Sequence, residues 1–194
     1  MLSLVAGVFI STALSISVAA ETAPKSSLAD QCEAALKIYG EKGDPKLLRS
    51  ACEKVQVLGS QCKSVQGVPI YHYDKRGTHK TQQKILVFSL IHGDEVPAGS
   101  VGRFWMERLE SIEPRNTWRV VPVLNPDGVK LRTRTNANKV DVNRNFPTAD
   151  WETDARQYWA KYSNKNPRRN PGEKAASEPE TRCAIDHITD FKPD

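Results

Sequence analysis

The chain has 194 residues, a formal net charge of +5 and 39% hydrophobic residues. This length is sufficient for one domain with a sizeable core. The positive charge is modest, and no aromatic platform accompanies the basic clusters, so we expect no nucleic-acid binding.

Residues 1–20 are apolar and contain no charged side chain. They end with the small residues Val18 and Ala20 in the positions that a signal peptidase reads, although a positively charged start is missing. The segment predicts a secretory signal peptide, with a membrane anchor as the alternative, for which it is short. After cleavage no other segment is long and apolar enough to cross a bilayer, so we expect a periplasmic or secreted protein.

Residues 21–63 are predicted to form a helical N-terminal segment. A first helix carries Ala35, Ile38 and Tyr39 at helical spacing, and the run "GEKGDP" then breaks the pattern. A second helix is expected over residues 46–57, which would complete a helical hairpin.

Four cysteines punctuate the chain. Cys32, Cys52 and Cys62 lie in the N-terminal segment, and Cys183 lies near the other end. In an exported chain we expect a disulfide among the first three, and the sequence leaves the pairing open. No Cys-x-x-Cys spacing occurs, so a structural zinc site is not expected.

The pattern changes at residue 64. Residues 64–77 suggest a strand or hairpin, and "KILVFSLI" predicts a fully buried strand. A helix is expected to begin near Pro97, and "TWRVVPVLN" is rich in strand-forming residues. Strand, helix and strand over this length predict a crossover unit with parallel strands. The apolar stripe of the helix is expected to contain Val101, Phe104, Trp105 and Leu109.

The rest of the chain is richer in turns. Residues 125–147 predict a long loop, "DWETDARQYWAKYSN" a short helix, and "KNPRRNPGEK" a second loop. A final helix is predicted to start at a capping box formed by Ser177 and Glu180. Its buried face is expected to contain Ala184, Ile188 and Phe191.

Polar residues follow both predicted strands of the crossover unit. His92 and Glu95 follow the first strand, and Asn125 and Asp127 follow the second. Ligands in open α/β sheets bind beyond the carboxyl ends of the strands. An imidazole and a carboxylate three residues apart suit zinc. Alone, the pair is more typical of a hydrogen-bonded histidine beside a helix-capping carboxylate than of a metal site.

Four motifs in order change this balance: "HGDE", "LNPDG", "RTNANKVDVNRNFP" and "SEPET". Together they resemble the zinc carboxypeptidase family (peptidase M14), and within it the murein peptide amidase branch. The resemblance covers residues 64–194 and implies a carboxypeptidase-like α/β fold. That fold has a mixed, largely parallel sheet with helices on both faces, and the sequence would contain a partial domain that is incomplete at the C-terminus.

The resemblance implies specific roles. His92 and Glu95 match the first two zinc ligands of the family, so Zn²⁺ is the expected cofactor. Arg134 matches the arginine that stabilises the oxyanion, with Arg132 as the competing alignment. The substrate carboxylate would be bound by Asn143 and Arg144, and the loop braced by Asn145 and Phe146.

Three departures from the family pattern matter. Asp94 stands where digestive carboxypeptidases commonly have Arg, which favours the murein branch. Lys139 stands where that branch usually has Gly, which is awkward if the turn needs a positive φ. The family's third zinc ligand and its glutamate base would come after the "SEPET" helix, so we expect a truncated chain that is inactive alone. His72 and His79 are expected at the surface, and His187 lies on the final helix itself, so none of the three is an expected ligand.

The implied reaction is zinc-dependent hydrolysis of a peptide or amide bond, with a cell-wall muropeptide as the substrate and the γ-D-glutamyl–diaminopimelate bond as its target. Two alternatives stay open. Deacylases of the succinylglutamate desuccinylase and aspartoacylase type share part of the pattern and act on N-acyl amino acids. A non-catalytic wall-binding protein would retain Asn143 and Arg144 without using a metal.

Overall fold

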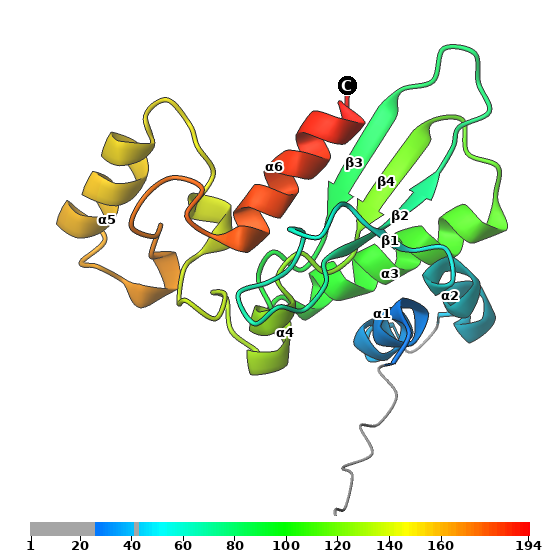
Figure 1. Ribbon diagram of the computed structural model, residues 1–194, viewed down its shortest axis with the longest axis horizontal. Helices are drawn as coiled ribbons and strands as arrows, with labels where there is room; N and C mark the ends of the chain where they lie inside the picture. The colour runs from blue at the N-terminus through cyan, green and yellow to red at the C-terminus, as the bar shows by residue number, and fades with distance from the viewer. Residues whose placement is uncertain (1–25, 41–42) are drawn as a thin grey trace, which may run out of the picture.

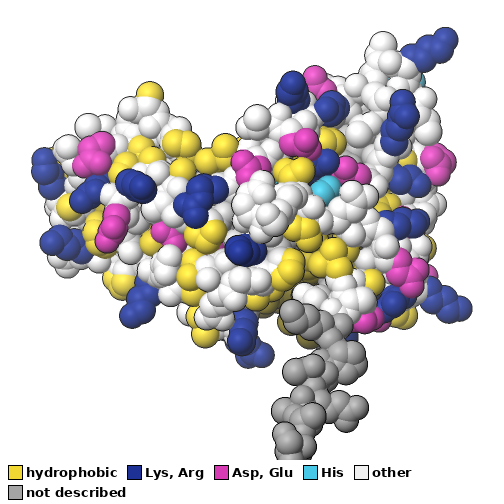
Figure 2. Space-filling view, viewed as in Figure 1, with side chains coloured by type: hydrophobic (Ala, Val, Ile, Leu, Met, Phe, Trp, Pro, Cys, Tyr) yellow, Lys and Arg dark blue, Asp and Glu magenta, His cyan; other side chains and the backbone are white. Residues whose placement is uncertain are grey.

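A computed structural model describes residues 26–40 and 43–194 of the chain. The predicted signal peptide lies outside the described residues. Within the described part, every helix falls short of the length and apolar character that a membrane span requires. Acidic and basic side chains are interspersed over the face of the molecule seen in Figure 2.

The centre of the fold is a four-stranded mixed sheet with the order β1-β2-β4-β3 (Figure 1). The strands are β1 (Gln56–Val57), β2 (Tyr71–Lys75), β3 (Lys84–Phe88) and β4 (Thr117–Val121). Helix α3 (Val96–Ser111) connects β3 to β4, which run parallel as predicted. The other two pairings are antiparallel. The expected mixed α/β fold is therefore confirmed, but the description of the sheet as largely parallel was wrong.

Each face of the sheet packs against its own helices. Side chains alternate along a strand, so Val120 joins the core on the α3 side and Val121 joins the core on the other side. The α3 side contains Met106 and Leu109, and the opposite side contains Ala184 of α6 (Pro179–Phe191). Helices therefore cover both faces, as predicted (Figure 1).

Strand β3 is less buried than its sequence suggests. All five of its residues are half-buried, although "KILVFSLI" predicted a fully buried strand. In the described sheet β3 pairs only with β4 and forms an edge. An edge strand has no neighbour on one side, so its apolar side chains keep part of their surface accessible.

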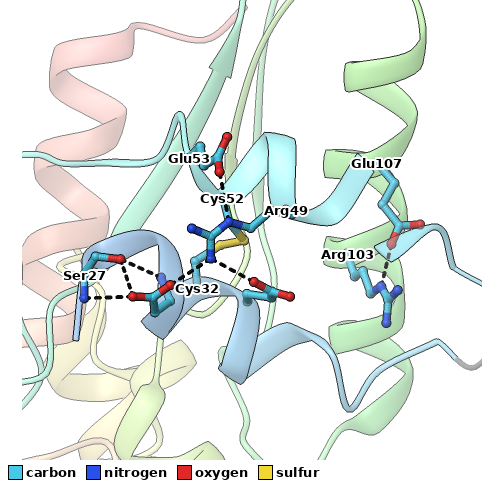
Figure 3. Close-up of a disulfide and its surroundings, with 9 residues drawn as sticks. Ser27, Cys32, Arg49, Cys52, Glu53, Arg103 and Glu107 are labelled. Carbon is cyan, nitrogen blue, oxygen red and sulfur yellow. Dashed lines mark hydrogen bonds and ion pairs between the residues drawn. A yellow bond between two sulfur atoms is a disulfide. The ribbon is translucent and has the colours of Figure 1, made fainter. Parts of the chain in front are cut away.

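The predicted helical hairpin consists of α1 (Leu28–Leu36) and α2 (Pro45–Cys52). A disulfide joins Cys32 to Cys52, and Arg49 of α2 forms ion pairs with two carboxylates of α1 and with Glu53, which directly follows α2 (Figure 3). The second helix ends at Cys52 instead of residue 57, because Gln56 and Val57 pair with β2. The division of the chain at residue 64 stays a prediction.

The buried face of α3 differs from the predicted stripe. Val101 and Phe104 are 49% and 57% exposed, whereas Arg103 and Glu107 are buried. The hairpin is the reason, because α2 packs against the polar side of α3. The helical pattern predicts buried positions from apolar residues alone. It therefore missed the face of α3 whose central side chains, Arg103 and Glu107, are charged.

Arg103 fastens the hairpin to α3. Its guanidinium donates hydrogen bonds to the backbone carbonyls of Lys37 and Tyr39 at 3.2 and 2.6 Å. It also pairs with Glu107 at 2.6 Å (Figure 3). Glu107 in turn accepts a hydrogen bond from the backbone N–H of Asp44. Buried charges are tolerated only when they are paired in this way.

The chain after β4 follows the predicted outline with several short helical turns. They are α4 (Pro126–Leu131), the 3₁₀ turn η1 (Val142–Arg144), the π-helix η2 (Trp151–Gln157), α5 (Tyr158–Lys161) and the 3₁₀ turn η3 (Pro167–Arg169). Helices η2 and α5 form the predicted short helix, at the far left of Figure 1.

Helix α6 begins without the predicted capping box. Its N-cap is Glu178, whose side chain does not cap the helix. Glu180 instead accepts hydrogen bonds from the Val65 backbone N–H and from Asn136. Of the three residues predicted for its buried face, Ala184 and Phe191 are buried and Ile188 is 41% exposed.

A second disulfide joins Cys62 to Cys183 and ties the segment before β2 to α6. A bond among the first three cysteines was expected and is found between Cys32 and Cys52. The partner of Cys62 was not foreseen, because 121 residues separate it from Cys183 and only the fold brings them together.

Lys139 closes a tight turn with a φ of 60°, and its N–H donates to the Asn136 carbonyl at 3.0 Å. This left-handed conformation favours glycine, as the sequence comparison with the murein branch suggested. We predict that Lys139→Gly raises the free energy of unfolding by about 1 kcal/mol.

Thermal unfolding of the original protein and of Lys139→Gly measures this change in stability. The matched control is Lys37→Gly, at a position with ordinary right-handed φ, which should lower the melting temperature. A melting temperature that falls in Lys139→Gly would contradict the proposed strain.

Candidate active site

The predicted zinc ligands lie side by side beyond the carboxyl end of β3. His92 is buried, and Glu95 is the N-cap residue of α3 with a half-exposed side chain. The Nδ1 atom of His92 lies 2.9 Å from Oε1 of Glu95. The coil between β3 and α3 therefore brings the His92 and Glu95 side chains together.

Gly93 makes this turn possible. A Cβ atom at this position would lie 1.9 Å from the carbonyl carbon of Gly128, well inside van der Waals contact. The Gly93 N–H donates to the Thr133 carbonyl at 2.9 Å. Only glycine lets the His92 turn approach α4 and the following loop this closely.

Asp141 connects the two halves of the site. Its fully buried carboxylate accepts hydrogen bonds from Nε2 of His92 and from Nε of Arg134, both at 2.9 Å. Arg144 adds an ion pair at 3.4 Å. Asp141 also begins η1 by accepting the backbone N–H of Asn143 at 3.2 Å. Asp141 is not among the site residues predicted from the sequence.

A recognisable signal for Asp141 existed. A histidine that binds a metal through one ring nitrogen usually donates its other N–H to a carboxylate or carbonyl oxygen. In the loop motif "RTNANKVDVNRNFP" only one residue, Asp141, carries a carboxylate. The motif itself therefore pointed to it.

The charges of the cluster support one another. Burial lowers the pKa of His92, but its hydrogen bonds with Asp141 and Glu95 and the Asp141 charge outweigh burial and raise it. Burial raises the pKa of Asp141, but the contacts with His92 and Arg134 outweigh burial and lower it. Asp141 is therefore held as a carboxylate that fixes the orientation of the imidazole.

The structure distinguishes between the two candidate arginines. Arg134 lies against the site, with its Nη1 atom 3.3 Å from Oε1 of Glu95. Arg132 instead ends α4 in a left-handed conformation with a φ of 52°. The location of Arg134 agrees with the predicted oxyanion role, which stays a prediction.

The predicted carboxylate clamp is exposed beside this cluster. Asn143 and Arg144 are both solvent-accessible, and 42% of the Arg144 side chain is exposed. Asn145 is completely buried and braces the loop. Its side chain donates to the carbonyls of Pro171 and Lys174 and accepts the N–H of Glu178. Phe146, the second expected brace, packs against the core on the α6 side.

The other polar residues at the strand ends stabilise the scaffold. Asn125 caps α4 and donates to the Ile91 carbonyl. Asp127 accepts hydrogen bonds from Ser64 and from the Gln66 backbone. Both side chains are completely buried, so neither is free to reach a substrate.

His92 and Glu95 fit a zinc ion as two ligands. In a tetrahedral site with bonds of about 2.1 Å, neighbouring ligand atoms lie about 3.4 Å apart. The observed 2.9 Å needs only a small opening. His79 is exposed as predicted, whereas His72 is buried against His187, so the expected surface position of His72 was wrong. Among the described residues, no hydrogen bond joins any of these three histidines to the His92–Glu95 pair.

Comparison with known proteins identifies the family to which this fold belongs. The zinc carboxypeptidase family matches residues 46–193. Murein peptide amidase A of Escherichia coli (strain K12) is 30% identical over 135 residues, which cover 68% of this chain and 53% of the relative. Carboxypeptidase SOL1 of Arabidopsis thaliana is 34% identical over 113 residues, or 50% of this chain and 22% of the relative.

Solved structures of murein amidases and carboxypeptidases share the fold of this chain. The crystal structure of murein-tripeptide amidase MpaA from Escherichia coli O157 has a TM-score of 0.51 at 28% identity, covering 72% of this chain and 56% of that chain. Carboxypeptidase A from Helicoverpa armigera has a TM-score of 0.57 at 22% identity, covering 84% and 49%, and shows the shared fold.

The chain spans about half the length of the murein peptide amidases that it matches. The family match nevertheless extends over most of the described residues and includes every residue of the cluster around Asp141. The chain therefore belongs to the zinc carboxypeptidase family.

Proposed function

We propose that this chain contributes the zinc pair, the oxyanion arginine and the carboxylate clamp of a hydrolase that cleaves peptide or amide bonds. The observation that carries this proposal is the junction at Asp141, where His92 and Arg134 share one buried carboxylate 2.9 Å from each. The two side chains come from different strand-end loops, so the fold aligns a metal ligand with an oxyanion donor.

Each residue of the site would have a separate role in the reaction. When bound to His92 and Glu95, zinc would polarise a carbonyl oxygen and lower the pKa of a water molecule. Asp141 would hold the His92 ring so that Nδ1 faces Glu95. The guanidinium of Arg134 would stabilise negative charge that develops on the carbonyl oxygen. Arg144 would bind a substrate carboxylate with charge-assisted hydrogen bonds.

We propose a cell-wall muropeptide as the substrate, with the γ-D-glutamyl–diaminopimelate bond as the target. The relatives named murein peptide amidase support this choice. Asp94 lies next to the zinc pair and binds Arg168 at 2.8 Å, so the rim of the site carries both signs of charge. Such a rim suits a peptide that bears carboxylates and an amine. The match to the peptidase family favours this function over the N-acyl amino acid deacylases.

We further propose that the protein acts in the periplasm or outside the cell. The two disulfides of the structure support an oxidising compartment. A secreted form whose first residue is Glu21 is the expected product. An uncleaved chain in the cytoplasm would contradict this location.

The zinc pair predicts a defined pattern of metal affinity in the oxidised protein. His92→Ala should abolish zinc binding, and Asp141→Asn should weaken it about 10- to 100-fold by loosening the orientation of the imidazole. Isothermal titration calorimetry measures both effects. His79→Ala is the matched control, because His79 is exposed and should leave the affinity unchanged. Equal zinc affinity in His92→Ala would contradict the assignment.

The carboxylate clamp predicts selective binding of a muropeptide with a free terminal carboxylate. Arg144→Ala should weaken this binding about 10- to 100-fold, the effect of losing a charge-assisted hydrogen bond. A muropeptide with an amidated terminus should bind the original protein as weakly as the free-carboxylate muropeptide binds Arg144→Ala.

Fluorescence or NMR titration measures these affinities, and an N-acyl amino acid serves as the competing ligand class. Tighter binding of the N-acyl amino acid would overturn the muropeptide assignment. Muropeptide binding without turnover, unaffected by a chelator, would favour the non-catalytic wall-binding alternative.

A further inference from the structure

A second group of metal-ligating side chains lies on the α6 side of the sheet. Cys183 and His187 are one helical turn apart on α6, so both project from the same face of the helix. Cys62 comes from the segment before β2, and His72 lies on β2 itself. All four side chains are at least 95% buried.

Three of these side chains are close enough to share one ion, and His72 lies beside them. The sulfur atoms of Cys62 and Cys183 and a ring nitrogen of His187 lie within 4.8 Å of one another. The ring centroids of His72 and His187 are 4.9 Å apart. The two cysteines form a disulfide in this structure, so the sulfurs are not available as thiolates.

The histidines have unused hydrogen-bonding capacity. Both ring nitrogens of His187 and Nδ1 of His72 are buried without a partner among the described residues. Buried polar atoms are nearly always paired, and an unpaired one lowers stability. Three such nitrogens within one cluster therefore need an explanation.

The charge state of these rings suits metal binding. Burial lowers the pKa of His187 to about 4 and also lowers that of His72. The positive charge of Arg119 acts in the same direction, and Asp74 and Asp190 oppose it only in part because both are paired with Arg119. Both imidazoles are therefore neutral at pH 7, which is the form that ligates metals.

We propose that reduction of the Cys62–Cys183 disulfide creates a site for one tetrahedral, borderline-soft ion of the Zn²⁺ class. The ligands are the two thiolates and one ring nitrogen of His187, and the fourth position is open to the unpartnered Nδ1 of neighbouring His72. Two sulfurs and two nitrogens are a standard ligand set for structural zinc. This site is separate from the His92–Glu95 pair, which has no sulfur ligand.

The chemistry balances with a simple reductant. A water-soluble phosphine donates two electrons to the disulfide. The phosphine takes up the oxygen of one water molecule in this reaction and becomes a phosphine oxide. The two protons of that water convert the sulfurs into two thiols. Zinc binding then releases both thiol protons to solvent, because the ligands are thiolates.

The disulfide and the metal are alternative cross-links at the same place. Each ties α6 to the segment that leads into β2. In an oxidising compartment the covalent bond holds α6, and under reducing conditions the metal would replace it. The position of α6 matters to the active site, because Glu178 and Glu180 at its start bind Asn136 in the loop of Arg134.

Cobalt titration tests the site, because thiolate ligands give Co²⁺ a charge-transfer absorption that the His92–Glu95 pair cannot produce. The starting protein is Cys32→Ala/Cys52→Ala, which removes the other pair of thiols. After phosphine reduction we expect one equivalent of Co²⁺ to develop the band and Zn²⁺ to displace it. The oxidised protein should show no band.

Variants locate the ligands. Cys62→Ser and Cys183→Ser should each abolish one-to-one binding, and His187→Phe should weaken it at least tenfold. His79→Phe, at an exposed position, is the matched control and should bind normally. An unchanged cobalt affinity in His187→Phe would overturn the proposed ligand set.

Melting temperatures distinguish zinc binding by the folded protein from zinc binding by an unfolded chain. A 100-fold excess of zinc over its dissociation constant should raise the melting temperature of the reduced protein by about 5 to 10 °C and leave that of the oxidised protein unchanged. If reduction unfolds the chain, recovery of its circular dichroism on adding zinc supports the site. A reduced protein that zinc neither stabilises nor refolds would overturn the proposal.

Discussion

The site depends on one buried carboxylate, that of Asp141. It is completely inaccessible to solvent, yet it holds a negative charge because His92, Arg134 and Arg144 surround it. Removing one partner from a buried charge pair typically costs about 3–5 kcal/mol. The arrangement is therefore strongly coupled. The proposed metal ligand His92 and two arginines of the loop that follows α4 all contact this carboxylate, which fixes their positions.

A set of buried polar side chains holds that loop in place. Asn136 binds the carboxylates of Glu178 and Glu180, and Asn145 binds three backbone groups and Ser177. These contacts connect the loop to the start of α6 and give residues 125–147 a fixed path. Because buried polar groups lose stability when unpaired, such a network favours one arrangement over its competitors. Exposed Arg144 is thus presented from a rigid base.

The sequence predicted most of the architecture where local patterns agree with tertiary packing. The β3-α3-β4 unit followed from local patterns. The position of Arg134 beside Glu95 and the positive φ of Lys139 agree with what the family resemblance implied. Prediction failed where distant segments decide burial. Docking of the hairpin buries Arg103, whereas Phe104 stays exposed, and no pattern within α3 contains that information. The pairing of Cys62 with Cys183 likewise depends on the fold.

The most direct test of this account is the protonation pattern of the His92 ring, observed by long-range ¹H–¹⁵N correlation NMR before and after zinc is added. The account predicts that Nε2 keeps its proton and its hydrogen bond to Asp141, whereas the Nδ1 resonance shifts as zinc binds. A proton retained on Nδ1, with the zinc-induced shift at Nε2, would contradict the central role of Asp141.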